Sequence, residues 1–520
     1  MEKIINLGMP HVGEQIFESI ETDELFQFMS VSQTWKVLVE NVLIKRWKGG
    51  RIYYACEKGD TKVVQFILKY CRGCTGLNIK ATDGCTPLMM ACYQGHKEIV
   101  HLLLDHADTS IDINARDENG LTALMWAAEK GHNDIVKLLL DHSSDDSDET
   151  VELNAKDDDG MTAFLWAVDR GHNDIVKLLL DHSDESNELN ARDTHGLTGL
   201  MIACHDGNKN IVQSILNHLD KNIDLNATAE SDGGMTAYMY ACENGQTDVV
   251  KLLLDHSNES LLLNARDTHG RTGFIIACKN GQKEVVQLLL EDTDLNIEFN
   301  ARDEDGMNAL MWACHEGDKE IVQLLLNEPD PKIDWKAKDD TNGWTALMFA
   351  CQKGDKDVVQ LFLNLLNHSD INIELNARNN GGWTPFICAC HEGQKDVVQL
   401  LLDHSEPKID VNAKDDDGCT GFMLACSEGH KDVVEILLNR SDSNIELNLK
   451  DNDGYTAFIW ACQNGRTDIV ELLLNRSDIE INERDNDGWT GIMLAVDNRH
   501  KGVVKLFYYF KSKRYIDISE

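Results

Sequence analysis

One short stretch returns along almost the whole chain, and it constrains the fold more than any other feature. Its copies read DENGLTALMWAAEKGHNDIVKLLL at 117–140, DDDGMTAFLWAVDRGHNDIVKLLL at 157–180 and DEDGMNALMWACHEGDKEIVQLLL at 303–326. The glycine before its Thr recurs at intervals of 34 to 40 residues, at Gly84, Gly120, Gly160, Gly196, Gly234, Gly270, Gly306, Gly343, Gly382, Gly418, Gly454 and Gly488. Self-similarity at this period predicts stacked repeats and excludes a fold built on one closed core.

Each part of the stretch has a physical reading. Asp-x-x-Gly is turn chemistry, because Asp bonds the backbone that follows it and Gly accepts a positive φ. Thr122 then precedes a short apolar run and can cap a helix. The segment around Gly131 ends that helix, and 134–140 forms a second one with a broad apolar face. One such pair of helices cannot bury its apolar surface alone, so it must stack on further copies.

The pattern resembles the ankyrin repeat, and the likeness covers residues 51–520. It implies an all-α dominated solenoid of helix-turn-helix units with short β-hairpin tips. Ankyrin repeats usually carry a Thr-Pro-Leu-His signature, but here the Pro remains only at Pro87 and Pro385. The His position is apolar, as at Met125 and Met311, which calls into question the polar links that this His usually provides between repeats.

Composition limits the kinds of partner. The formal net charge is -40, from 49 basic and 89 acidic residues, which argues against nucleic acid and anionic membranes as partners. A basic or mixed-charge protein is the better match, and solubility of a long array is the alternative explanation of the charge. No run of 18 apolar residues and no signal-peptide pattern occur, so we expect a cytoplasmic or nuclear protein that is a monomer.

Most cysteines occupy one position of the repeat, directly after an Ala. They are Cys56, Cys92, Cys204, Cys242, Cys278, Cys314, Cys351, Cys390, Cys426 and Cys462. A residue repeated in this way is expected to be a small buried hydrophobic group and not half of a disulfide.

Residues 1–50 do not fit the repeat. Apolar residues at helical spacing and the capped start at Thr22 predict three short helices, which form too small a core to stand alone. This segment resembles an F-box, through Met9-Pro10, Ile16-Phe17, Glu24-Leu25, Val31-Ser32, Trp35-Lys36, Leu38 and Trp47 in the expected order. The resemblance implies that a Skp adaptor docks on Pro10, Ile16, Leu25, Val31, Trp35 and Leu38. The alternative is a helical cap that shields the first repeat.

The array has distinct ends. Residues 51–77 supply only the helix pair of a repeat, about twelve fuller repeats follow, and 485–520 is expected to be a C-terminal cap. In the cap, Arg499 replaces the usual glycine between the two helices.

Three sequence patterns resemble catalytic or metal-binding motifs, but each lacks a feature that such a site requires. Asp-His recurs at the end of second helices, where His interacts well with the helix dipole, whereas a catalytic pair would occur once in a pocket. Cys71 and Cys74 lack a second metal-binding pair. Turns such as 157–160 lack the alternating spacing and the distal Glu of a calcium loop. We therefore expect no enzyme activity, no metal and no cofactor.

The residue after each turn glycine is the candidate contact with a partner. In ankyrin arrays the hairpin tips and inner helices line a concave surface, and the resemblance places these residues at the tips. The candidates are Leu121, Met161, Met307, Trp344, Trp383, Tyr455 and Trp489, with Cys85, Leu197, Met235, Arg271 and Cys419 at the same position. Aromatic members gather towards the C-terminus, as anchors of binding sites do. The alternative is that these side chains pack between adjacent hairpins.

Together the two resemblances imply the substrate receptor of a Skp/cullin/F-box ubiquitin ligase. The F-box would dock the Skp adaptor, and the array would hold a target protein. The target and the cullin stay open, as does dependence on modification of the target. The alternative function is an interaction scaffold with no role in ubiquitin transfer.

Overall fold

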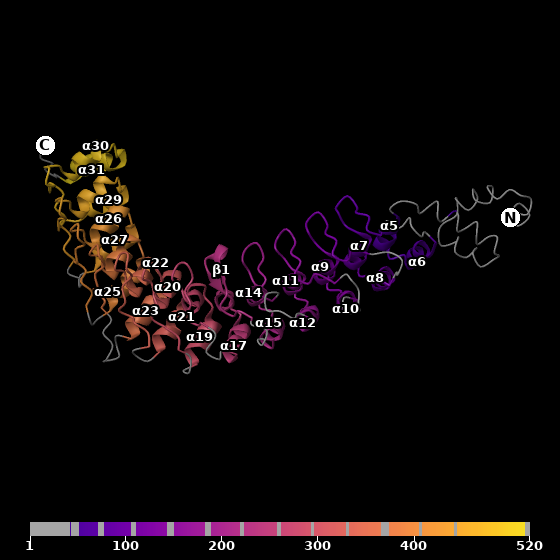
Figure 1. Cartoon of the computed structure of the whole chain (residues 1–520). Helices are drawn as coiled ribbons and strands as arrows, with labels where there is room; N and C mark the ends of the chain where they lie inside the picture. Colours follow the sequence, from indigo (N-terminus) through magenta and orange to yellow (C-terminus); the bar gives the residue numbers. More distant parts are fainter. Residues whose placement is uncertain are drawn as a thin grey trace, which may run out of the picture. The chain divides into compact units, whose positions relative to one another are not determined.

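The computed structural model describes residues 42, 51–70, 77–105, 111–142, 150–182, 189–218, 223–256, 262–292, 296–328, 332–365, 374–404, 408–440 and 445–514. In this part of the chain helices dominate, and they occur in pairs joined by short loops (Figure 1). The regular strands there are β1 (Thr228–Ala229) and β2 (Met235–Thr236), which pair antiparallel. The described chain is therefore an all-α repeat solenoid, as predicted.

Each repeat contributes a first and a second helix. The first helices are α5 (Arg51–Lys58), α7 (Pro87–Gln94), α9 (Ala123–Glu129), α11 (Ala163–Asp169), α14 (Gly199–Asp206), α16 (Ala237–Glu243), α18 (Gly273–Lys279), α20 (Ala309–Glu316), α22 (Ala346–Lys353), α24 (Pro385–His391), α26 (Gly421–Glu428), α28 (Ala457–Gln463) and α30 (Gly491–Asp497). The second helices are α6 (Thr61–Tyr70), α8 (Lys97–Leu104), α10 (Asn133–His142), α12 (Asn173–His182), α15 (Lys209–Leu216), α17 (Thr247–Asp255), α19 (Lys283–Glu291), α21 (Lys319–Asn327), α23 (Lys356–Leu365), α25 (Lys395–Asp403), α27 (Lys431–Asn439), α29 (Thr467–Leu474) and α31 (Lys501–Arg514). A short 3-10 helix, η2 (Glu230–Asp232), precedes β2.

The repeats belong to two compact bodies. The first body holds the described residues up to 237 together with 252–256, and the second body holds 238–251 and the described residues from 262 onward. In the first body, α5, α7, α9, α11 and α14 pack in that order, each on the next. In the second body, α18, α20, α22, α24, α26, α28 and α30 do the same. Each body is thus a stack in which one repeat covers the apolar face of its neighbour.

The core is made of apolar residues that recur at fixed positions of the repeat. In α9, Leu124, Met125, Ala127 and Ala128 are buried, and the second helix α10 adds Ile135, Val136, Leu139 and Leu140. The cysteines after Ala are buried free thiols, as are the other cysteines of the described residues. The predicted role of these cysteines as small core groups is confirmed.

The first helices begin at the Thr that the sequence predicts as a cap. Oγ1 of Thr122 accepts a hydrogen bond from the N–H of Met125 at 3.3 Å, and Sδ of Met125 accepts one from the N–H of Thr122 at 3.4 Å. Thr86, Thr198 and Thr420 are closed by a methionine in the same way. The Met at the His position of the ankyrin signature therefore completes a capping box through its weakly accepting thioether.

Polar links between repeats come from another position, the residue after the glycine between the two helices. Nε2 of His132 lies 3.1 Å from the carbonyl oxygen of Tyr93 in the preceding repeat. Gly95, beside this contact, has φ 79, and a Cβ there would lie 2.5 Å from Cε1 of His132. Polar links between repeats therefore exist, and the residue after this glycine provides them in place of the capping position, as a His, Gln or Arg.

Candidate functional site

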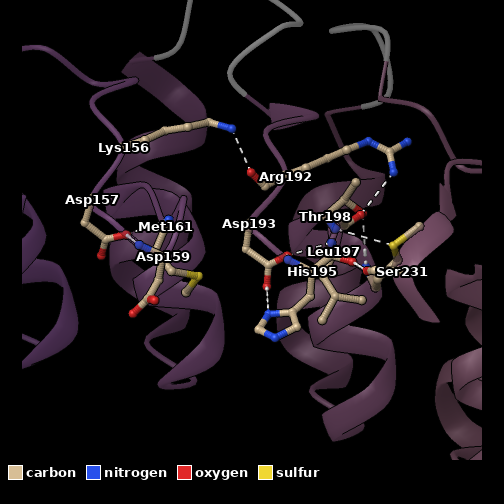
Figure 2. A network of polar contacts seen from close by, with 12 residues as sticks. Lys156, Asp157, Asp159, Met161, Arg192, Asp193, His195, Leu197, Thr198 and Ser231 are labelled. Atoms are coloured by element: carbon tan, nitrogen blue, oxygen red, sulfur yellow. Dashed lines mark hydrogen bonds and ion pairs between the residues drawn. The ribbon is translucent and has the colours of Figure 1, made fainter.

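The Asp-x-x-Gly turn, here called the tip, is held by its own carboxylate. Oδ1 of Asp157 accepts hydrogen bonds from the N–H groups of Asp159 at 3.0 Å and Met161 at 2.8 Å (Figure 2). Gly160 closes the turn with φ 75. Asp193 makes the same bonds in the next repeat, to His195 and Leu197. Where a tip begins with Asp, this residue therefore fixes the direction of the residue after the glycine.

Neighbouring tips are joined to one another. The N–H of Asp158 donates to the carbonyl oxygen of Asn119 at 3.0 Å, and the N–H of Thr194 donates to that of Asp159 at 2.9 Å. Nζ of Lys156 donates to the carbonyl oxygen of Arg192 at 2.7 Å (Figure 2). Since such bonds recur from repeat to repeat, the tips of each body form a row with regular spacing.

An asparagine that was not among the predicted site residues strengthens this row. Nδ2 of Asn114 donates to the carbonyl oxygen of Thr150 at 2.8 Å, and its Oδ1 accepts from the N–H of Glu152 at 2.9 Å. Asn264, Asn300, Asn376 and Asn448 make the same pair of bonds to the following repeat. The signal was available, because this Asn stands two residues before the basic residue of each tip.

The second carboxylate oxygen of the tip holds a tryptophan. Nε1 of Trp166 in α11 donates to Oδ2 of Asp157 at 2.8 Å. Trp126, Trp312 and Trp460 bond Asp117, Asp303 and Asp451 in the same way. These indoles fix the first helix against its tip, and their N–H groups are occupied within the chain.

The aliphatic candidates at the tips are buried. The exposed fraction is 7% for Leu121, 8% for Met161 and 7% for Met307. Such side chains offer almost no surface to a partner, so the expectation that these three lie open at the tips is corrected. The reason is geometric, because the stacked hairpins of adjacent repeats enclose a side chain of this size.

The aromatic candidates keep part of their surface. Trp344, Trp383 and Tyr455 are partly buried, and Trp489 is exposed with 41% of its surface accessible. A flat ring is too large to fit between two tips, so one edge or face stays in solvent. The aromatic half of the predicted row is therefore the part that a partner can reach.

These rings contact further rings of the first helices. The centroids of Trp344 and Phe349 lie 5.2 Å apart, and His315 lies 5.8 Å from Phe349 and 5.6 Å from Trp312. In the next repeat Trp383 lies 4.8 Å from His391. Trp312, Phe349 and His315 were not among the residues predicted for this surface.

The ring of Tyr455 lies 5.1 Å from that of Trp460 near several carboxylates. Burial raises the pKa of the Tyr455 hydroxyl, and the charges of Asp485, Asp453, Asp451 and Asp487 raise it further. The potential around this ring is therefore negative.

The remaining predicted residues are placed as follows. Pro10, Ile16, Leu25, Val31, Trp35 and Leu38 of the F-box-like segment, and also Cys71 and Cys74, lie outside the described residues. The Asp-His pairs at 141–142 and 181–182 do end second helices, α10 and α12. Across the described ranges, no group of His, Cys, Asp and Glu side chains could hold a metal ion. None of the helices described here is both long and apolar enough to cross a membrane.

Comparison with known proteins agrees with this architecture. A search of curated proteins gave no match. The family model described as ankyrin repeats (3 copies) matches residues 52–150, 147–229, 185–264, 223–303, 259–338, 295–377, 331–415, 361–451 and 422–519. Because these matches cover nearly all of the helix pairs described above, the chain belongs to the ankyrin-repeat family.

Proposed function

We propose that this chain is the substrate-recognition subunit of a Skp/cullin/F-box ubiquitin ligase. Ankyrin repeats are protein–protein interaction modules, so the array would hold the target protein. The F-box-like residues Pro10, Leu25 and Trp35 would bind the Skp adaptor. The contribution of this chain is binding energy and position, and the ubiquitin chemistry belongs to other subunits.

The target-binding part of the proposal rests on the aromatic row of the second body. Trp344, Trp383, Tyr455 and Trp489 keep accessible surface, whereas the candidates Leu121, Met161 and Met307 at the same tip position are buried. Large aromatic groups with exposed surface are typical of the anchors of protein interfaces. Trp344 and Trp383 stand in consecutive repeats, as do Tyr455 and Trp489, and this arrangement favours a partner segment that runs along several tips.

A binding experiment tests the ligase part. The purified full chain is expected to retain a purified Skp adaptor, and Leu25→Asp combined with Trp35→Ala is expected to abolish retention. Trp344→Leu combined with Trp383→Leu is the matched control, because these residues lie in the array and should leave Skp retention unchanged. If the intact chain retains no Skp adaptor, the chain is an interaction scaffold whose N-terminal segment acts as a cap.

A further inference from the structure

Several rings of the first helices are covered by cations of the chain itself. Nζ of Lys130 lies 4.8 Å from the ring centroid of Tyr93, and the guanidinium carbon of Arg170 lies 5.3 Å from that of Trp166. In the second body, Nζ of Lys279 lies 4.2 Å from the ring of Trp312. The ring faces at this surface therefore bind Lys and Arg side chains, since the negative face of an indole or phenol attracts a cation.

Beyond Trp312 this pattern stops. Across the residues that the structure describes, no Lys or Arg lies over the ring of Trp344 or Trp383. Lys353 retains a basic residue at the repeat position of Lys130, but it lies over no described ring. These two tryptophans therefore have aromatic surface that the chain itself does not use for a cation.

The charge at this repeat position also differs between repeats. Lys130 and Arg170 are the residues directly before the glycine between the helices, and Glu316 and Glu392 occupy that place in the second body. Oε1 of Glu316 lies 3.0 Å from Nδ1 of His315, and Oε1 of Glu392 lies 3.2 Å from Nδ1 of His391. Where the repeats of Lys130 and Arg170 bring their own cation, those of Glu316 and Glu392 present a carboxylate.

Contacts connect each carboxylate to one of the two tryptophans. Glu392 bonds His391, whose ring lies 4.8 Å from that of Trp383. Glu316 bonds His315, which contacts Phe349 at 5.8 Å, and Phe349 in turn contacts Trp344 at 5.2 Å. The side chains of Glu316 and Glu392 are 39% and 37% exposed, so both carboxylates can be reached from solvent.

The indole N–H groups distinguish these rings from the structural tryptophans. Nε1 of Trp312 donates to Oδ2 of Asp303 at 2.8 Å, as its equivalents do in other repeats. Within the described ranges, the indole N–H of Trp344 and that of Trp383 donate to no other group. Trp344 contacts Phe349 at an interplanar angle of 36° and Trp383 contacts His391 at 56°, and both indoles keep accessible surface that a ligand can reach.

We propose that Trp344 and Trp383 bind Arg or Lys side chains from an extended basic segment of the partner protein, and that Glu316 and Glu392 pair with those cations. The net charge of -40 and the negative potential around Tyr455 favour the same class of partner. This inference rests on the proposed protein-binding function and specifies the chemistry of its ligand.

Fluorescence anisotropy of labelled peptides with the full chain tests the inference. The probes are four peptides of equal length that alternate Gly with Arg, Lys, Glu or Leu. The variants are Trp344→Leu with Trp383→Leu, and Glu316→Gln with Glu392→Gln. The control is Glu118→Gln with Glu304→Gln, which removes the same charge at exposed tips. Circular dichroism verifies that every variant folds.

We expect the Arg and Lys peptides to bind, and each of the two test pairs to weaken binding by about tenfold, the equivalent of roughly 1.4 kcal/mol. The control pair should change affinity less than twofold. If all variants bind basic peptides equally, attraction by the overall charge explains the binding and the inference is wrong.

Two further outcomes separate the inference from the function on which it rests. If the Leu or Glu peptide binds through the two tryptophans while the basic peptides do not, the surface binds protein, but the inference that its ligand is a basic segment is wrong. If no peptide depends on the tryptophans, the inference fails, and retention of the Skp adaptor still tests the ligase role independently.

Discussion

An alanine at Gly199 would place its Cβ 2.5 Å from Cε1 of Phe164, a ring in the first helix of the preceding repeat. Gly199 is the first residue of α14, so its lack of a side chain makes room for the ring. Where Leu124 stands in place of the phenylalanine, the next first helix begins with Ala163. Residue size is thus matched between these consecutive repeats, and in the same way a Cβ at Gly273 would lie 2.5 Å from Cε1 of Tyr238.

Gly199→Ala is predicted to destabilise the protein. A ring cannot move aside without disturbing a packed core, and overpacking of this kind costs about 1–3 kcal/mol. In a Phe164→Leu background the same substitution should be neutral or slightly stabilising, because Ala favours helix more than Gly by about 1 kcal/mol. Urea denaturation of the unmodified protein, the two single variants and the double variant measures the coupling free energy between Gly199 and Phe164. Equal effects of Gly199→Ala in both backgrounds would show that the two residues are independent.

His132→Ala is predicted to lower stability by about 1 kcal/mol, since it removes the bond to the Tyr93 carbonyl and leaves that oxygen without its partner. The chain itself provides a conservative replacement. Nε2 of Gln282 donates to the carbonyl oxygen of Glu243 at 2.6 Å at the equivalent position of another repeat. His132→Gln should therefore retain most of the stability in thermal denaturation. A loss as large as that of the alanine variant would mean that ring packing, not the hydrogen bond, matters.

Arg499→Gly is predicted to raise the melting temperature. Arg499 has φ 61, the left-handed conformation that the equivalent glycines adopt in other repeats. A residue with a side chain costs about 1–2 kcal/mol in this conformation. Arg499→Ala is the control, because it removes the guanidinium and keeps the Cβ. If both variants raise the melting temperature equally, the arginine side chain and not the backbone conformation is the source of the strain.

The buried cysteines are predicted to resist alkylation in the folded protein at pH 9. Burial raises the pKa of the Cys56 thiol to about 12, from an ordinary value of 9.0, and that of Cys388 also to about 12. Little thiolate therefore forms at pH 9, and the reagent has no access. With Cys71→Ser and Cys74→Ser removing the thiols outside the described residues, mass spectrometry should show labelling only after denaturation. Rapid labelling of the native protein would contradict this arrangement.

The same pKa shifts predict a loss of stability in alkali. Because the folded-state pKa is raised above the unfolded value of 9.0, the contribution of these thiols is fully present below pH 9. It is lost as the pH rises from 9 towards about 12, since the unfolded chain releases the protons first. Cys56→Ala should reduce the fall of the melting temperature between pH 9 and about 12. An unchanged slope would show that the Cys56 thiol does not contribute to the loss of stability.

Much of the architecture could be predicted from the residues. The cap at Thr122, the turn at Gly120 and the break at Gly131 are local signals, and each is repeated in copy after copy. The candidate surface was less predictable. Its aromatic members, such as Trp344, stand at a recognisable repeat position, but the role of Phe349 and His315 depends on contacts between repeats.

What the sequence by itself determined is the repeat, its caps and its turns, because these depend on hydrogen bonds and backbone conformations within a few residues. Only the tertiary structure decided which tip residues remain accessible. Leu121 and Trp344 follow the same glycine in their repeats, yet one is buried and the other keeps an accessible ring. The physical reason is that exposure is set by the size and packing of neighbours in adjacent repeats, which lie 34 to 40 residues away along the chain.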